Sequence, residues 1–268
     1  MLDHILFEVI LDMKKRFFII GEQRSGTIAL GDALCSHPEI SVFGELFLNF
    51  PSADNLNSYF EFVAVKSKRG VERFYPHFDY IRNNLNDLFD YLESIDSSPI
   101  YGFHLKYDQV TYVVEIMKHL NELGFFCIHV IRPRVLDTLL SQIALASRHS
   151  QGLPSHTAVN SAEDMDLIVE LPDISVLEKR ALDIEARVNK NRSFLRNYFI
   201  GNYMEVTYPD FLAHDGHGGY ANILMALGAR DNNKLISTIK KSSSSCNLIY
   251  SNKDVISDPR LTSIVIDV

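Results

Sequence analysis

The residues best suited to chemistry lie in one short segment, GEQRSGT, at positions 21–27. The apolar run at 17–20 predicts a strand buried on both faces, and Leu30, Ala33 and Leu34 after the segment have helical spacing. A glycine-bounded loop between a strand and a helix gathers backbone amides that bind anions. We therefore predict that residues 21–27 hold the 5′-phosphate end of a nucleotide. The alternative is a turn that binds nothing.

The loop differs from the Walker A sequence, G-x-x-x-x-G-K-[ST], in the residues that handle magnesium and ATP. Gly21 and Gly26 have the Walker spacing, but Thr27 stands in the place of the lysine and Ile28 in the place of the metal-binding hydroxyl. A magnesium-dependent NTPase uses both of those side chains. The positive charge and the hydroxyl donors come instead from Arg24, Ser25 and Thr27. The segment therefore predicts an anion site that works without the usual metal apparatus.

The sequence RSGT after a buried strand, followed by HPEI at 37–40 and GE at 44–45, resembles the 5′-phosphosulfate loop of sulfotransferases. These enzymes use 3′-phosphoadenosine-5′-phosphosulfate (PAPS). The likeness is to the carbohydrate and tyrosylprotein branch and its bacterial relatives, since the cytosolic steroid and phenol branch usually has lysine in place of Arg24. Family loops often have a second hydroxyl residue after Thr27, where this chain has Ile28. The resemblance implies that PAPS is bound by Arg24, Ser25, Gly26 and Thr27.

A second pair of residues suits a phosphate. The predicted strand at 124–131 ends at Arg132, and Ser141 follows nine residues later on a predicted helix. A guanidinium donates two parallel charged hydrogen bonds to a phosphate, although an arginine at a strand end is often a salt-bridge partner instead. The pair resembles the sulfotransferase motif for the 3′-phosphate, with the spacing of the bacterial lipopolysaccharide and sulfoglycolipid type. The resemblance implies that Arg132 and Ser141 bind PAPS.

A further predicted strand, at 101–107, carries two candidate catalytic residues. Alternation along the strand places His104 and Lys106 on the same face. Bacterial relatives often have a lysine in the corresponding strand before a D-Q pair, and here Lys106 precedes Asp108 and Gln109. Whether His104 or Lys106 meets the sulfuryl group is left open by the sequence, and a half-exposed strand face is the alternative for each.

Glu45 is the candidate general base. An acceptor hydroxyl loses its proton as it attacks sulfur, so a carboxylate or an imidazole is needed within hydrogen-bond reach. Residues 41–44 form a short extended stretch that can return the chain to the sheet beside the loop. The matching glutamate of the tyrosylprotein branch is the base, and the resemblance implies this role for Glu45. The alternatives are a salt-bridging role for Glu45 and His104 as the base, since imidazole titrates near neutrality.

The C-terminal part also resembles the family pattern, in which a lysine precedes a loop and an N-x-D pair follows. Lys240 and Lys241 precede a serine run, and LIYSNKDV follows at 248–255. The resemblance implies that one of the two lysines closes over the 3′-phosphate or the adenine. A solvated basic helix end is the alternative.

Short apolar strands that alternate with helices predict the architecture that positions these residues. We expect one α/β domain over residues 1–268, with a P-loop-like three-layer parallel sheet and ligand loops at the carboxyl ends of the strands. Residues 48–98 and 147–197 are predicted to be helical insertions, and the polar stretch at 147–171 within the second is predicted to be irregular.

Composition limits the classes of partner and the compartment. A net charge of −8 argues against a nucleic acid or an anionic membrane as the main partner. The three cysteines are widely spaced and lack metal-type pairing, which predicts no metal site and a reducing compartment. The apolar-rich residues 1–13 are too charged and too short for a membrane span. We expect a cytoplasmic protein without a membrane anchor.

Together these features predict a sulfotransferase that moves the sulfuryl group of PAPS to a hydroxyl, or less readily an amine, of a small molecule or carbohydrate. Arginine, lysine and backbone donors would replace magnesium, by analogy with phosphoryl transfer. Two other classes fit the same loop: a nucleotide-dependent kinase with an altered P-loop, and a non-catalytic protein that binds adenosine 3′,5′-bisphosphate (PAP). The acceptor itself is not readable from the sequence.

Overall fold

The structure is a computed structural model that describes residues 14–47, 58–67, 78–109, 112–152, 165–208, 219–230 and 246–268. Its centre is a five-stranded sheet in the order β2-β3-β1-β4-β6, and every neighbouring pair is parallel. The strands are β1 (Lys15–Gly21), β2 (Ile40–Glu45), β3 (Ile100–Lys106), β4 (Phe126–Ile131) and β6 (Tyr203–Thr207). Because all five run the same way, their carboxyl ends meet at one edge, where such sheets place their ligands.

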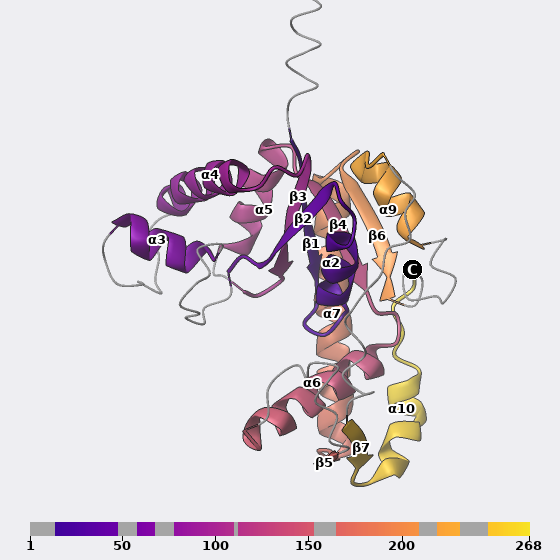
Figure 1. Ribbon diagram of the computed structural model, residues 1–268. Coiled ribbons are helices and arrows are strands. Elements are labelled where there is room, and N and C mark those ends of the chain that lie inside the picture. The colour runs from indigo at the N-terminus through magenta and orange to yellow at the C-terminus, as the bar shows by residue number, and fades with distance from the viewer. Residues whose placement is uncertain are drawn as a thin grey trace, which may run out of the picture.

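Helices cover both faces of this sheet, since alternate residues of the buried strands face opposite sides. One face of β1 packs on α2 (Thr27–Cys35) and α9 (Gly219–Leu227) through Phe17 and Ile19. The other face packs through Phe18 and Ile20 on α4 (Phe78–Ile95), α5 (Val113–Glu122) and α7 (Ile174–Tyr198). Figure 1 shows α4 and α5 on one side of the strands and α9 on the other. The predicted P-loop-like three-layer α/β fold is confirmed.

The remaining elements extend the fold in two directions. In the first predicted insertion, the described residues form α3 (Tyr59–Ser67) and α4, which are helical as expected. Below the sheet in Figure 1 lie α6 (Val135–Ser150), η2 (Lys253–Ser257), α10 (Pro259–Thr262) and a small sheet of β5 (Met165–Val169) and β7 (Cys246–Tyr250). β5 and β7 are parallel neighbours.

The prediction that residues 147–171 are irregular is wrong for the described part of that stretch. α6 continues to Ser150, and Met165–Val169 is strand β5. The reason is that β5 pairs with β7, about eighty residues further along the chain, with Met165 opposite Cys246. A short strand whose partner is so distant has no local signal beyond its own five residues.

Within the described ranges, no helix has both the length and the apolar character that a membrane span requires.

Candidate functional site

The loop at 21–27 is a compact turn beneath the N-terminus of α2. A Cβ added to Gly21 would lie 2.5 Å from Ser25 Oγ and 2.7 Å from the carbonyl oxygen of Val130, so only glycine fits there. Arg24 and Gly26 have positive φ values of 71° and 106°, which turn the chain into the helix. The amide of Ser25 donates to the carbonyl oxygen of Glu22 at 3.0 Å. The local sequence therefore produces the predicted strand-loop-helix cradle.

Ser25 shows that this cradle suits an anion. Its side chain is 2% exposed, and within the described residues its Oγ has no hydrogen-bond partner. A buried hydroxyl without a partner is uncommon, because the lost hydration is not replaced. The oxygen of a phosphate or phosphosulfate group in the cradle would accept that hydrogen bond. The Ser25 hydroxyl therefore fits the anionic group that the sequence predicts.

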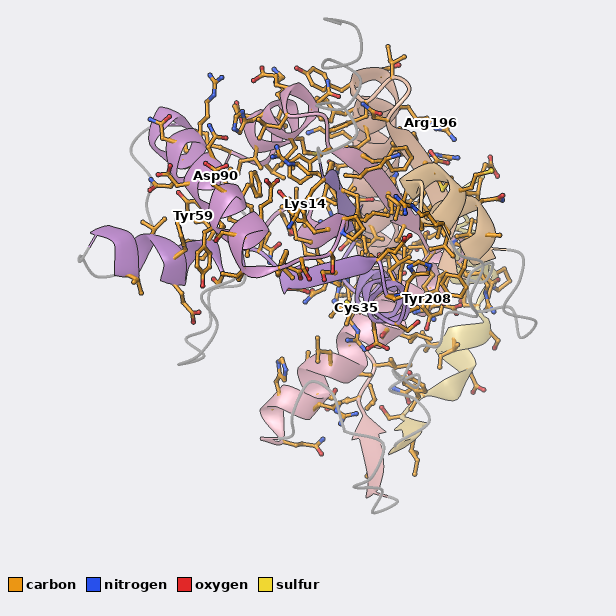
Figure 2. The ribbon with its side chains drawn as sticks, turned by 45° about the horizontal axis from the view of Figure 1, so that its top comes forward. Lys14, Cys35, Tyr59, Asp90, Arg196 and Tyr208 are labelled. Carbon is orange, nitrogen blue, oxygen red and sulfur yellow. The ribbon has the colours of Figure 1, made fainter. Side chains whose placement is uncertain are left out.

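The second predicted motif lies directly against the loop. Arg24 Nε donates to Ser141 Oγ at 3.0 Å, and Arg132 Nη1 lies 3.4 Å from the backbone oxygen of Arg24. The guanidinium of Arg132 lies over the ring of Tyr208, 4.8 Å from its centroid. Figure 2 shows Tyr208 far from Tyr59, so this cluster is distinct from the α3 region. The structure thus brings together Arg24, Ser141 and Arg132, which are up to 117 positions apart in the sequence.

Positive charge is concentrated at this point. Burial, and then the nearby charges of Arg132 and Arg148, lower the pKa of Arg24. Arg148 is 3% exposed and lies two helical turns beyond Ser141 on α6. Among the described residues, one acidic side chain forms an ion pair with Arg132: Asp137, whose Oδ2 lies 3.8 Å from Arg132 Nη2. Arg148 was not predicted from the sequence, although its seven-residue separation from Ser141 places both residues on one side of the helix.

Lys106 and Glu45 form a second polar group at the same edge of the sheet. Lys106 Nζ donates to Thr27 Oγ1 at 2.6 Å and lies 3.2 Å from Glu45 Oε1. Gln109 braces both residues, because its Nε2 lies 3.4 Å from Glu45 Oε2 and its Oε1 accepts from the Lys106 amide at 3.1 Å. Burial lowers the pKa of Lys106, and the carboxylate of Glu45 opposes that change. Lys106 therefore joins the loop at residues 21–27 to the carboxylate of Glu45.

His104 lies on the same face of β3 but not in this hydrogen-bonded group. Its ring packs against α2, where a Cβ on Gly31 would lie 2.0 Å from Nε2. Neither ring nitrogen has a hydrogen-bond partner within the described residues. Burial, followed by the charge of Lys106, lowers the pKa of His104 to about 3. These surroundings are those of a neutral core residue, and a catalytic role for His104 stays a prediction.

Two features of the site complete the comparison with the sequence. The carboxylate of Glu22, inside the loop, is bound by Arg187 of α7. The sequence carries no signal for this contact, because the two residues are 165 positions apart. Lys240 and Lys241 lie outside the described residues, so their role stays a prediction. Across the part of the chain that is described, no group of three or more histidine, cysteine, aspartate or glutamate residues is placed to hold a metal ion.

Several solved structures have a fold similar to that of this chain. The sulfotransferase domain from the curacin biosynthetic pathway matches with a TM-score of 0.50 at 13% identity, over 85% of this chain and 78% of that one. The chain has a sulfotransferase fold. Two other sulfotransferase-fold structures match at 14% identity. A sulfotransferase from Alicyclobacillus acidocaldarius has a TM-score of 0.45 over 85% and 86% of the two chains. Mouse sulfotransferase SULT7A1 complexed with PAP has a TM-score of 0.46 over 92% and 74%.

By sequence alone, no protein-family model and no curated protein matches the chain. The assignment of the sulfotransferase fold therefore rests on structural likeness, and the activity is argued from the site.

Proposed function

We propose that this protein is a PAPS-dependent sulfotransferase that acts on a hydroxyl of a small molecule or carbohydrate. The observation that carries the proposal is the hydrogen bond from Arg24 Nε to Ser141 Oγ, with Arg132 beside it. It joins the predicted 5′-phosphosulfate loop to the predicted 3′-phosphate motif at one edge of the sheet. A nucleotide with phosphates at both its 5′ and 3′ positions needs two such anion sites close together.

The residues present suit the two ends of that nucleotide. Ser25, Thr27 and the loop amides would hold the 5′-phosphosulfate, and Arg132 with Ser141 would hold the 3′-phosphate. Bound PAPS supplies an activated sulfuryl group, so the protein has to orient it and handle one proton. Lys106 donates a hydrogen bond to Thr27 Oγ1, so its positive charge lies beside the loop. That charge stabilises the negative charge that develops at the 5′-phosphate as the sulfuryl group departs.

Glu45 is the group that accepts the proton of the acceptor hydroxyl. Its carboxylate lies 3.2 Å from Lys106 Nζ and is 17% exposed, so it is held beside the loop and open to the acceptor. A carboxylate at this position is within reach of an acceptor hydroxyl and can take its proton. Glu45 and Lys106 therefore act together: one takes the proton, and the other offsets charge on the leaving group.

The loop argues against a kinase. Thr27 stands where the P-loop lysine would be and Ile28 where the metal-binding hydroxyl would be, and Thr27 instead accepts a hydrogen bond from Lys106.

We further propose a cytoplasmic location. Cys35 and Cys127 are free thiols in the described structure, which agrees with a reducing compartment.

Two measurements test the proposed function. Isothermal titration should show binding of PAP, with weaker binding of adenosine 5′-phosphosulfate, which lacks the 3′-phosphate. A panel of hydroxylated metabolites and sugars incubated with ³⁵S-labelled PAPS should then yield a labelled product. Hydrolysis of ATP with magnesium would instead indicate the kinase, and tight PAP binding without turnover on the panel would indicate a PAP-binding protein. Failure to bind PAP would refute the sulfotransferase proposal.

A further inference from the structure

An acidic side chain lies inside the anion loop. Glu22, directly after the end of β1, is 7% exposed. Its Oε2 accepts from Arg187 Nε at 2.6 Å, and its Oε1 accepts from Arg187 Nη2 at 3.2 Å and from Gln142 Nε2 at 3.2 Å. Both carboxylate oxygens are therefore occupied, and the charge is neutralised by a two-pronged ion pair.

The contacts of Glu22 belong to a larger set that fastens the loop. Gln142 Nε2 also donates to the backbone oxygen of Gln23 at 3.1 Å. The next residue, Arg24, is bound to Ser141 through its side chain and to Arg132 through its backbone oxygen. Three consecutive loop residues thus contact α6 or the strand end before it, and Glu22 also contacts α7.

This fastening matters because the loop has a strained conformation. Arg24 has a φ of 71°, which a residue other than glycine adopts only where its surroundings hold it. A carboxylate released from Arg187 at this position would also repel the phosphate groups that the loop amides attract. Glu22 therefore requires a partner that both neutralises it and keeps it turned toward α7.

We propose that Arg187 is a positioning residue for nucleotide binding, which holds the Glu22 carboxylate on α7 so that the loop presents its amides, Ser25 and Arg24 to the anion. The inference rests on the proposed function, because the anion is taken to be the 5′-phosphate end of PAPS or PAP. Arg187 acts through Glu22 and does not contact the reacting atoms.

The test is the affinity for PAP, measured by isothermal titration calorimetry on the full chain. Arg187→Ala should weaken binding about tenfold or more, because it leaves a buried carboxylate unpaired in the anion site. Arg187→Lys should lose less, about threefold to tenfold, since it keeps the charge but not the fork. Lys190→Ala is the matched control. It removes one positive charge from an exposed position of the same helix and should leave PAP affinity unchanged.

A double variant separates positioning from a purely structural role. Glu22→Gln should bind PAP within about threefold of the wild type, since the amide oxygen still accepts from Arg187. In Glu22→Gln/Arg187→Ala the repelling charge is gone, so binding should recover by about threefold or more relative to Arg187→Ala. The KM for PAPS should follow the same order, with kcat much less affected. Thermal melting of each variant shows that it is folded.

The outcomes decide between the two proposals. If the wild type binds PAP and Arg187→Ala or Arg187→Lys binds it equally well, the positioning role of Arg187 is wrong and the proposed function stands. The role is also wrong if the double variant binds PAP more weakly than Arg187→Ala. If Arg187→Ala fails to fold, unchanged affinity in Arg187→Lys still refutes the inference. If the wild type does not bind PAP at all, both proposals fall.

Discussion

Lowering the pH should destabilise this protein through its buried histidines, and His104 allows the effect to be measured. Burial lowers the pKa of His104 to about 3 and that of His129 to about 3, whereas the unfolded chain has the ordinary value of 6.5. Between these values the unfolded chain binds more protons than the folded chain. The free energy of unfolding therefore falls as the pH falls through 6.5.

The size of this effect follows from the two pKa values. Between about pH 7.5 and about pH 5.5, one such histidine lowers the free energy of unfolding by about 1.4 kcal/mol, and two lower it by about 2.7 kcal/mol. This loss in the free energy of unfolding hardly depends on the pKa of the histidine in the folded protein, as long as that pKa lies well below 5.5. His104 is the cleaner probe, since His129 also bonds to the hydroxyls of Tyr107 and Tyr203.

The assay is urea unfolding of the wild type and His104→Leu at both pH values. The wild type should lose about 1.4 kcal/mol more than the variant on acidification, because the variant lacks the contribution of His104. The matched comparison cancels every other titrating group. An equal loss in both proteins would show that His104 titrates normally in the folded state. His104 would then be available as a base near neutrality and would replace Glu45 as the favoured candidate.

Three other predictions test the site and its scaffold. Glu45→Gln should lower kcat about 10²-fold or more while PAPS affinity stays nearly unchanged; near-full turnover in this variant, with none in His104→Ala, would make His104 the base. Arg132→Ala should weaken PAP binding by roughly 2 to 5 kcal/mol and Ser141→Ala by about 1 kcal/mol. Equal losses for adenosine 5′-phosphosulfate would contradict the 3′-phosphate assignment. Gly31→Ala should lower the free energy of unfolding by about 1 to 3 kcal/mol, because its Cβ would meet the His104 ring, and an unchanged melting temperature would contradict this packing.

Local sequence patterns were sufficient to predict those elements that neighbouring residues in the chain form by themselves. The apolar run, the glycines and the helical spacing around residues 17–34 predicted β1, the loop and the start of α2, and the structure has them. The extended stretch before Glu45 was predicted to return the chain to the sheet, and it is the outer strand β2. The strand before Arg132 was predicted from its continuous apolar run, and the strand around Lys106 from the alternation of its side chains.

Pairings between distant residues were not predictable in this way. Strand β5 was missed because its partner β7 lies far along the chain. The Glu22–Arg187 ion pair was missed because 165 positions separate the two residues and Arg187 lies in no motif. A charge pair brought together by the packing of α7 against the sheet leaves no periodic signal in either segment. Such contacts are known only when the helix has been placed.

The sequence by itself determined that residues 21–27 form a glycine-bounded loop between a strand and a helix, and that His104 and Lys106 share one face of a strand. Only the tertiary structure decided what those two side chains contact. Gly31 of α2 packs directly over His104 and keeps it in the core, whereas Lys106, one pleat further along, lies at the end of β3 and reaches Thr27 and Glu45. The physical reason is the position of each residue along β3 relative to α2. Alternation fixes the face of a strand, but the packing of the helix across it fixes burial, and with burial the pKa and the hydrogen-bond partners of each residue.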